Sequence, residues 1–351
     1  MDPNLGTRTM NFTTKTAHFS FGDEFKVLSL LQDIQLVYYP LLAIIGVPVN
    51  LLAIIILSQG KCGLSKCVTR YLVAMASADL LVVIIDLIMR QIPISHQGHF
   101  PLMDFLDSIR VCNIHAVVLY AVTDCSVWFT VTFTIDRYVA ICCQKLKEKY
   151  CKEKTAAVVL GMVTVLFTVK DIFWYFMLQG IYWGGNYPYF CVEHGGGYTF
   201  SPIMSAFELL HLFLTPFLPF ILILLLNALT VRHVLQASRA RKRLRAHGSG
   251  ESPSDPEMKS RRKSLILLFI ISANFILLWA MYLLDSVWER MGNMGIRYVG
   301  LPDFMQELGF MFQLLSCCTN TGIYCMTQTK FREQLVKMLL YPCCFIVELV
   351  E

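Results

Sequence analysis

The chain has 351 residues, of which 56% are hydrophobic and 16% are charged, and its mean hydropathy is +0.55. Soluble globular proteins carry about 45–50% apolar and about 25% charged residues, so a chain this apolar cannot cover its own surface in water. The composition therefore excludes a soluble enzyme, a nucleic-acid-binding protein and a disordered chain. The net charge of +5 is informative only by position, because membranes sort positive charge by side.

Seven mostly apolar stretches of about 20 residues are each long enough to cross a ~30 Å hydrocarbon core as a helix. The predicted fold class is therefore an all-α membrane protein, a seven-transmembrane helix bundle. Charges or Gly/Pro clusters separate consecutive stretches. The predicted spans are Val37–Leu57, Tyr71–Ile92, Ile109–Cys142, Ala156–Met177, Ile203–Val231, Leu265–Val287 and Phe304–Met326.

The distribution of lysine and arginine predicts which side each loop faces. With the N-terminus outside, twenty-two of these residues fall in cytoplasmic segments and six fall outside, as the positive-inside rule requires. We expect a multi-pass plasma-membrane protein with an extracellular tail (residues 1–36), a bundle (37–327), and an eighth helix with a cytoplasmic tail (328–351). The third cytoplasmic loop (232–263) is expected to be partly disordered. Its two ends are expected to extend the flanking helices, over Arg239–Arg245 and Lys259–Lys263.

The predicted topology also sorts the thirteen cysteines. Only Cys112 and Cys191 fall on the oxidising outer side, so we expect them to form a disulfide. Cys343 and Cys344 follow a basic amphipathic segment, a setting typical of palmitoylation. Asn11 opens an Asn-Phe-Thr sequon in the outer tail and is a predicted glycosylation site.

Short motifs fall in order along these spans. The third span ends in Asp136-Arg137-Tyr138, and an Asp-Arg pair at a membrane edge is costly unless the two charges pair. The sequence resembles the rhodopsin-like (class A) G-protein-coupled receptors in this motif and in the order and spacing of further motifs over nearly the whole chain. The other motifs are Asn50 in span one, Asp79 within Ser-Ala-Asp-Leu-Leu in span two, Trp128, Pro219, Trp279, the segment Asn320–Tyr324, and Lys330-Phe331-Arg332.

Within that class, the chain resembles the orphan group of probable G-protein-coupled receptor 139. The likeness is carried by Val37–Gln59, by Tyr71–Asp79 and by Asn227, where most class A receptors have tyrosine. That group responds to aromatic amino acids and related small molecules. The chain departs from the resemblance at several positions: Met281 and Thr321 replace prolines of the class, the proline after the third span and the tryptophan of span four are absent, and Tyr282 replaces an arginine of the group. The missing arginine weakens the expectation of the same ligand, because a partner for a carboxylate is absent.

The resemblance implies roles for polar residues inside the bundle. The residues that it assigns to a sodium ion and its water are Asp79, Ser126, Ser316 and Asn320. Hard cations take oxygen ligands, and the alternative is a hydrogen-bonded polar core without an ion. Asp136 would hold Arg137 in the resting state and release it on activation. The implied activation switch is Asp136, Arg137, Tyr138, Asn227, Trp279 and Tyr324.

Charged and aromatic residues near the outer ends of the spans are candidate ligand contacts. Both signs of charge occur there, which suits a zwitterionic or peptide ligand, and Leu119 stands where amine receptors carry aspartate. Internal pairing is the alternative for each residue, as for Asp86 and Arg90, which are four apart on one helix face. The candidate set is Asp86, Arg90, Tyr120, Asp124, Glu208, His211, Tyr282, Asp285 and Phe310, with Lys170 and Asp171 adjacent in span four.

We therefore expect a cell-surface receptor that binds an extracellular amino-acid-like or peptide ligand and activates a heterotrimeric G protein. Catalysis is not expected, because no zinc-protease, nucleophile-elbow or P-loop motif occurs. No cofactor is expected beyond the sodium ion, and the expected partners include membrane lipids but no nucleic acid. A seven-span transporter is the alternative, although it predicts broken helices in related halves that the sequence does not show. Ser260 and Ser264 lie beside basic residues and are candidate kinase targets.

Overall fold

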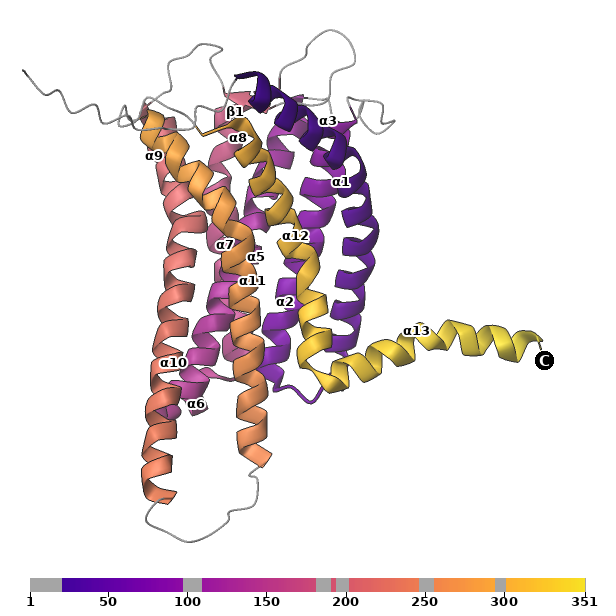
Figure 1. Cartoon of the computed structure of the whole chain (residues 1–351), viewed down its shortest axis with the longest axis vertical. Coiled ribbons are helices and arrows are strands. Elements are labelled where there is room, and N and C mark those ends of the chain that lie inside the picture. Colours follow the sequence, from indigo (N-terminus) through magenta and orange to yellow (C-terminus); the bar gives the residue numbers. More distant parts are fainter. Residues whose placement is uncertain are drawn as a thin grey trace, which may run out of the picture.

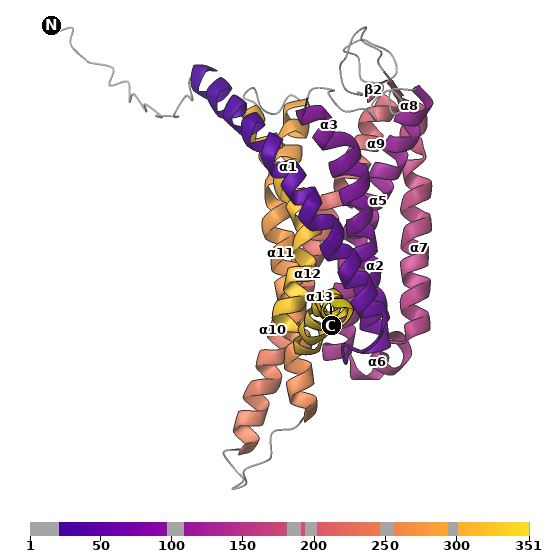
Figure 2. The same cartoon turned by 90° about the vertical axis from the view of Figure 1, so that its right-hand side faces the viewer.

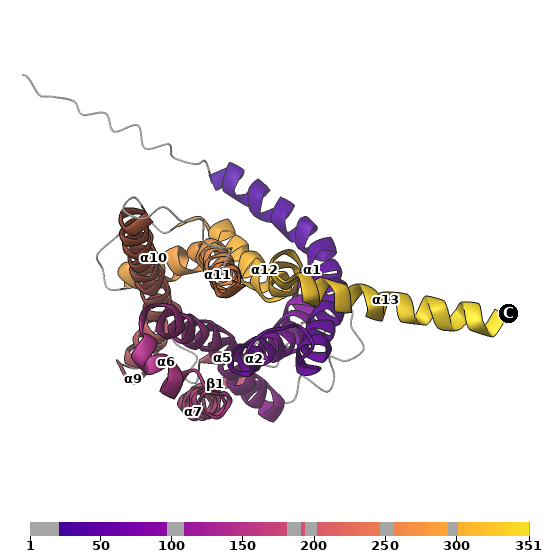
Figure 3. The ribbon, with the colours of Figure 1, turned by 90° about the horizontal axis from the view of Figure 1, so that it is seen from below.

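The structure is a computed structural model, and it describes residues 21–96, 109–180, 191–193, 202–245, 256–293 and 301–350. Long helices run along a common axis and, seen along that axis, lie in a ring (Figures 1 and 3). Their bounds, in chain order, are α1 Phe21–Ser58, α2 Lys66–Val82, η1 Val83–Gln91, α3 Ile92–Ser95, α5 Ile109–Cys142, α6 Gln144–Tyr150, α7 Glu153–Asp171, α8 Phe173–Met177, α9 Pro202–Leu212, η2 Phe213–Phe217, α10 Leu218–Arg245, α11 Pro256–Asn293, α12 Asp303–Thr327 and α13 Thr329–Val350. The predicted all-α membrane bundle is confirmed.

The bundle has polar groups inside and apolar groups outside. Asp79, Asp124 and Asp136 are at most 2% exposed, whereas Met162 and Leu277 are 68% and 71% exposed. A soluble protein has the reverse arrangement, since charged residues are almost never fully buried there. In lipid, large apolar side chains face the hydrocarbon and ionisable groups face the interior. The arrangement is that of a membrane protein.

Among the described residues, six helices are long and apolar enough to cross a membrane: Glu24–Ser58, Lys66–Ser95, Asn113–Cys142, Glu153–Phe176, Ala206–Arg239 and Arg262–Trp288. The seventh predicted span is helical as α12 and packs against α11 and α1. It is less apolar than the others because Gln313, Asn320 and Thr321 lie on it and face the interior. The seventh helix is therefore recognised by its packing better than by its hydropathy.

The first helix begins earlier than the sequence predicted. The residues up to 36 were expected to be a tail, but α1 starts at Phe21. Leu31, Gln35, Tyr39 and Leu42 recur at helical spacing and are buried. Gln35 Nε2 donates a 2.6 Å hydrogen bond to Glu307 Oε2 of α12. Charges scattered over residues 23–33 lowered the hydropathy and hid this turn-by-turn pattern. The early part of α1 leans away from the ring (Figure 2).

The middle of α1 approaches α12 closely. A Cβ atom at Gly46 would lie 2.6 Å from Cys318 Sγ, so any larger residue there would require Cys318 to move. Asn50 Nδ2 donates to the carbonyls of Gly46 and Cys317, both at 3.0 Å. Thr321, at the position where the class usually carries proline, donates from Oγ1 to the Val49 carbonyl at 3.0 Å. The departure at Thr321 therefore adds a bond between spans one and seven.

Span five is interrupted at Thr215. Its backbone is extended there (φ −153°, ψ 104°), because the following Pro216 disfavours the helical conformation of the residue before it. Trp128 Nε1 of α5 donates to the freed Leu214 carbonyl at 3.1 Å. The span therefore consists of α9, η2 and α10, and the motif residue Pro219 lies at the start of α10 rather than at the break.

The end of the bundle that is predicted to be cytoplasmic is mostly helical where the structure describes it. α10 reaches Arg245 and α11 starts at Pro256, so both helices continue into the segment 232–263, as expected for its ends. In Figure 1 they project below the other helices, and α13 runs sideways from the foot of α12. At the opposite end, the strands β1 (Leu178–Gly180) and β2 (Cys191–Glu193) pair antiparallel, with Gly180 opposite Cys191.

Candidate functional site

A small cavity of about 130 Å³ lies toward the end of the bundle that is predicted to be extracellular, and it is called the outer cavity below. Six of the predicted ligand contacts line it, together with five residues outside that candidate set. The predicted six are Asp86, Arg90, Tyr120, His211, Tyr282 and Phe310, and the other five are Leu119, Thr123, Thr215, Trp279 and Gln313. Helical spacing could have pointed to Thr123 and Gln313, which lie one turn from Tyr120 and Phe310, whereas Thr215 enters only because span five breaks there.

Asp86 and Arg90 pair with each other across one turn of η1. This segment is a π-helix, a form that is rare in proteins and frequent at functional sites. Arg90 Nε and Nη2 lie 2.8 and 2.7 Å from the same oxygen, Asp86 Oδ1. The guanidinium also sits 5.6 Å from the centre of the Phe310 ring. Asp86 is buried, the Arg90 side chain is 25% exposed, and both residues line the cavity.

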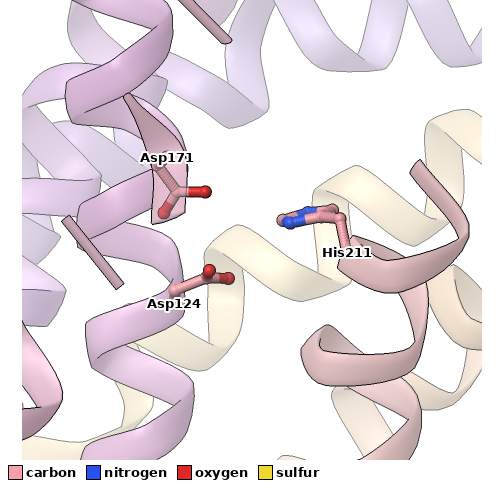
Figure 4. A group of neighbouring side chains, drawn as sticks. All are labelled: Asp124, Asp171 and His211. Carbon is pink, nitrogen blue, oxygen red and sulfur yellow. The ribbon is translucent and has the colours of Figure 1, made fainter. Parts of the chain in front are cut away.

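A second charged cluster lies behind the cavity, between α5, α7 and α9. Asp124, Asp171 and His211 point toward a common centre (Figure 4), with one ligand-type atom from each residue within 4.8 Å of the others. The Lys170 ammonium fills that centre: it lies 2.7 Å from Asp124 Oδ2, 2.7 Å from Asp171 Oδ1 and 2.9 Å from His211 Nδ1. An ammonium can only donate, so His211 Nδ1 accepts. The cluster is a cation site already filled by the chain itself.

Aromatic rings connect this cluster to the cavity. The Tyr120 ring stacks on Trp174 with centroids 4.3 Å apart, and both rings meet His211 edge-on, at 5.1 and 5.7 Å. His211 and Tyr120 also line the outer cavity. A ligand that displaced the ring of Tyr120 or of His211 would therefore disturb His211, which accepts a hydrogen bond from Lys170.

Three predicted contacts lie outside the cavity lining. Asp124 belongs to the Lys170 cluster, and Glu208 forms an ion pair with Arg290 of α11. Asp285 is half-buried on α11 and has an interaction of its own. Asp124 and Glu208 are therefore paired within the protein. Internal pairing was the alternative to ligand contact for every charged residue of the candidate set.

The four residues assigned to a sodium site surround one small space of about 10 Å³ in mid-bundle. Ser126 Oγ donates to Asp79 Oδ1 at 2.6 Å, and Asn320 Nδ2 donates to Asp79 Oδ2 at 2.7 Å. Ser316 lies on the same wall. The donor set is rich in oxygen, and the space is about that of one water molecule. The residues therefore fit a small hard cation or a single water.

At the end of the bundle that is predicted to be cytoplasmic, Asp136 and Arg137 form the expected ion pair, and both are buried. Arg137 Nε lies 3.0 Å from Asp136 Oδ2, and Cys67 Sγ donates to Asp136 Oδ1 at 3.1 Å. Arg137 Nη1 also donates to Ser264 Oγ of α11, at 3.3 Å. Arg137 thus contacts both α5 and α11.

A wider cavity of about 480 Å³ opens beside this pair, and Arg137, Ser264 and Cys151 are in its wall. Burial, with Asp136 nearby, raises the pKa of the Cys151 thiol to about 11, so that thiol stays protonated. Its Sγ donates to the Asp136 carbonyl at 3.7 Å. The cavity lies at the end of the bundle opposite to the outer cavity.

The remaining switch residues lie inside the bundle. Trp279 is 3% exposed and stacks on Phe275, with centroids 5.4 Å apart. Tyr324 is fully buried against Phe331 of α13, and Tyr138 is half-buried at the end of α5. Within the described part of the chain, neither the Tyr324 hydroxyl nor the Asn227 amide has a hydrogen-bond partner. Such groups usually bind water or change partner.

For the cysteines of the predicted disulfide and palmitoylation sites, the structure describes only the backbone. Cys112 lies in the first turn of α5 and Cys191 opens β2, and α5 and β2 are in contact. Their side chains lie outside the described part of the structure, as do those of Cys343 and Cys344 on α13 and the whole of Asn11. These assignments stay predictions.

The described residues define a helical membrane protein with a cavity near each end and polar residues between the two cavities. Residues 49–324, more than half of the chain, match the family described as 7 transmembrane receptor (rhodopsin family), and the chain belongs to this family. The predicted class A resemblance is confirmed, and the family is one of receptors that are generally not enzymes. The resemblance to the orphan 139 group stays a prediction.

Proposed function

We propose that the protein is a cell-surface receptor, with its N-terminus outside, that binds a small zwitterionic ligand and activates a heterotrimeric G protein. The observation that carries this proposal is the position of Trp279, which lines both the outer cavity and the polar cavity around Asp79. A ligand pressing on Trp279 would change the polar core directly. Such a coupling needs two arrangements that the ligand stabilises unequally.

The outer cavity supports a small ligand. Its volume of about 130 Å³ is below the roughly 300–1,000 Å³ of sites for drug-sized molecules. Its charged lining residues are Asp86 and Arg90, which form one ion pair, and His211 also lines it. A zwitterion would give its carboxylate to Arg90 and its ammonium to Asp86 without leaving a net buried charge. This favours the small zwitterion over the peptide.

The sodium ion belongs to the same proposal. Asp79, Ser126, Ser316 and Asn320 would hold the ion in the resting state, where the space around them is small. The ion would add one positive charge to a buried carboxylate whose hydrogen-bond partners among the described residues, Ser126, Asn320 and Cys317, are neutral. At the cytoplasmic side, release of Arg137 from Asp136 would offer the guanidinium to the G protein.

The test is a screen of amino acids and short peptides on cells that express the chain, read by calcium and by cyclic AMP. We expect a response to a small zwitterion in wild type and none in an Arg137→Ala variant at matched surface expression. Uptake of the compound without either signal, in both variants, would favour the transporter alternative and contradict the proposal.

A further inference from the structure

The π-helix η1 carries both residues of the ion pair that lines the outer cavity. It runs from Val83 to Gln91, and Asp86 and Arg90 lie on it. Since π-helices are rare and mostly occur as single turns, nine consecutive residues in this form need support from the neighbouring structure. The sequence supplies part of this support. Pro93 has no N–H to donate to the carbonyl four residues earlier, which weakens a regular α-helix at this point.

A second support reaches η1 from α5. His115 Nε2 lies 2.9 Å from the carbonyl oxygen of Ile85, which is inside the π-helical segment. A carbonyl oxygen can only accept, so His115 Nε2 carries a hydrogen and donates it to this bond. His115 is 6% exposed, and the bond is therefore shielded from water. Because Ile85 directly precedes Asp86, the bond fixes the backbone next to the ion pair.

The helical form of η1 decides where Arg90 points. An α-helix turns by about 100° per residue, and a π-turn takes up one residue more than an α-turn. Replacing one π-turn by an α-turn would therefore rotate the side chains beyond it by about that angle relative to α2. Arg90 lies near the end of η1, and its guanidinium sits 5.6 Å from the centre of the Phe310 ring. The rotation would carry the guanidinium away from this ring and from the wall of the outer cavity.

We propose that His115 is a positioning residue of the outer cavity: its bond to Ile85 holds η1 in the π-helical form and thereby aims Arg90 at the carboxylate of the ligand. The part that concerns the ligand rests on the proposed function, whereas the support of η1 does not. His115 acts through Arg90, because the described residues that line the outer cavity include Arg90 but not His115. The aim matters, since a hydrogen bond weakens steeply when the angle at its hydrogen falls below about 120°.

Three variants of the full chain separate this role from general packing. His115→Leu keeps a side chain of similar bulk without a donor, and His115→Gln keeps an N–H donor at a similar distance from the backbone. Asn113→Ala is the matched control. Asn113 Nδ2 also donates from α5 to a backbone carbonyl, at 2.7 Å, but this carbonyl belongs to Tyr175 of α8 and not to η1.

The first measurement is amide hydrogen exchange over residues 83–91, with each chain in lipid nanodiscs and without ligand or G protein. His115→Leu should speed exchange in this segment about tenfold, because the wide turns lose a tertiary hydrogen bond. His115→Gln and Asn113→Ala should exchange there at the wild-type rate. Equal rates in His115→Leu and wild type would overturn the support of η1 by His115.

The second measurement is equilibrium binding of a panel of amino acids and their carboxamides to the same nanodiscs. A carboxamide keeps the shape of the amino acid and removes the negative charge that Arg90 would bind. For an amino acid that binds wild type, we expect an affinity about tenfold or more above that of its carboxamide, because hydrogen bonds between charged groups are stronger. In His115→Leu this ratio should fall to roughly threefold or less, as it should in Arg90→Gln, which removes the charge itself. His115→Gln and Asn113→Ala should keep the wild-type ratio.

The ratio of the two affinities distinguishes positioning from a merely structural role. A structural role for His115 would lower the affinity for an amino acid and for its carboxamide equally, and an unchanged ratio in His115→Leu would overturn the positioning role. If hydrogen exchange over η1 changes as expected but no amino acid binds wild type, the support of η1 by His115 stands and the proposed zwitterionic ligand fails.

Discussion

Trp279 and Asp79 line the same small cavity in the middle of the bundle, and Trp279 also forms part of the wall of the outer cavity. One buried indole therefore separates the candidate ligand space from the candidate ion space. Since packed side chains move between discrete arrangements rather than deforming continuously, a displacement of this ring would be felt at Asp79. This relationship suggests why the ligand and the ion should affect each other.

The ion prediction is that sodium stabilises the resting protein through Asp79. At a sodium concentration ten times its dissociation constant, linkage adds about 1.4 kcal/mol to the free energy of unfolding. Asp79→Asn should remove this increment, because the charge that holds the ion is gone. The measurement is the melting temperature in sodium against potassium at equal ionic strength. If wild type shows no difference between the two salts, the polar core without an ion is correct.

The next prediction concerns the Asp86–Arg90 pair. Arg90→Met should lower the free energy of unfolding by roughly 2–3 kcal/mol, because it leaves a buried carboxylate without its partner. The double variant Asp86→Asn with Arg90→Met should recover much of this loss, since no unpaired charge remains. Thermal unfolding of the two single variants and the double variant gives the coupling energy. Additive losses would show that the two charges do not stabilise each other.

The Lys170 cluster leads to a prediction with metal. Lys170→Ala removes the ammonium from between Asp124, Asp171 and His211, and it should cost roughly 3 kcal/mol or more. Two carboxylates and an imidazole are good zinc ligands. Zinc should therefore raise the melting temperature of Lys170→Ala while leaving wild type unchanged.

The matched control for the zinc experiment adds His211→Ala to Lys170→Ala. This double variant loses one of the three ligands and should respond to zinc weakly or not at all. An equal rise in both variants would place the metal elsewhere and contradict the idea that Lys170 fills a cation site.

The disulfide prediction uses the contact between β2 and α5. A bond between Cys112 and Cys191 should contribute roughly 3–4 kcal/mol by restricting the unfolded chain. Cys112→Ser and Cys191→Ser should each lose this stabilisation, and the double variant should lose no more than either. Cys325→Ser, at a half-buried free thiol, is the control. Mass mapping of the unreduced protein that finds Cys112 or Cys191 as a free thiol would refute the bond.

Much of the fold was predictable because the membrane restricts it to helices that bury polar groups. The third span was predicted as Ile109–Cys142, the same bounds as α5. The residues around Asp79 were grouped by resemblance, and the structure places them around one space. A motif residue inside a bundle must lie at a particular depth and on a particular helix face. Its position in the sequence therefore predicts which residues of other helices lie beside it.

Other features depend on how helices rotate and tilt against each other, which hydropathy does not encode. Lys170 and Asp171 were noted only as neighbours in span four, yet the Lys170 ammonium reaches Asp124 of α5 and His211 of α9. The break at Thr215 was missed because Pro219 was the conspicuous proline of the motif. Contacts such as Arg137 with Ser264 join residues far apart in sequence.

The central claim is that a ligand in the outer cavity promotes nucleotide exchange on a G protein at the other end of the bundle. The most direct test is GTP-analogue binding to a purified heterotrimer, with the full chain in nanodiscs and each small zwitterion found in the cell screen. The account predicts that exchange rises with ligand in wild type. It also predicts that Arg137→Ala abolishes the rise while ligand binding is retained. Ligand binding to wild type with no change in exchange for any heterotrimer, or movement of the ligand across sealed vesicles, would contradict it.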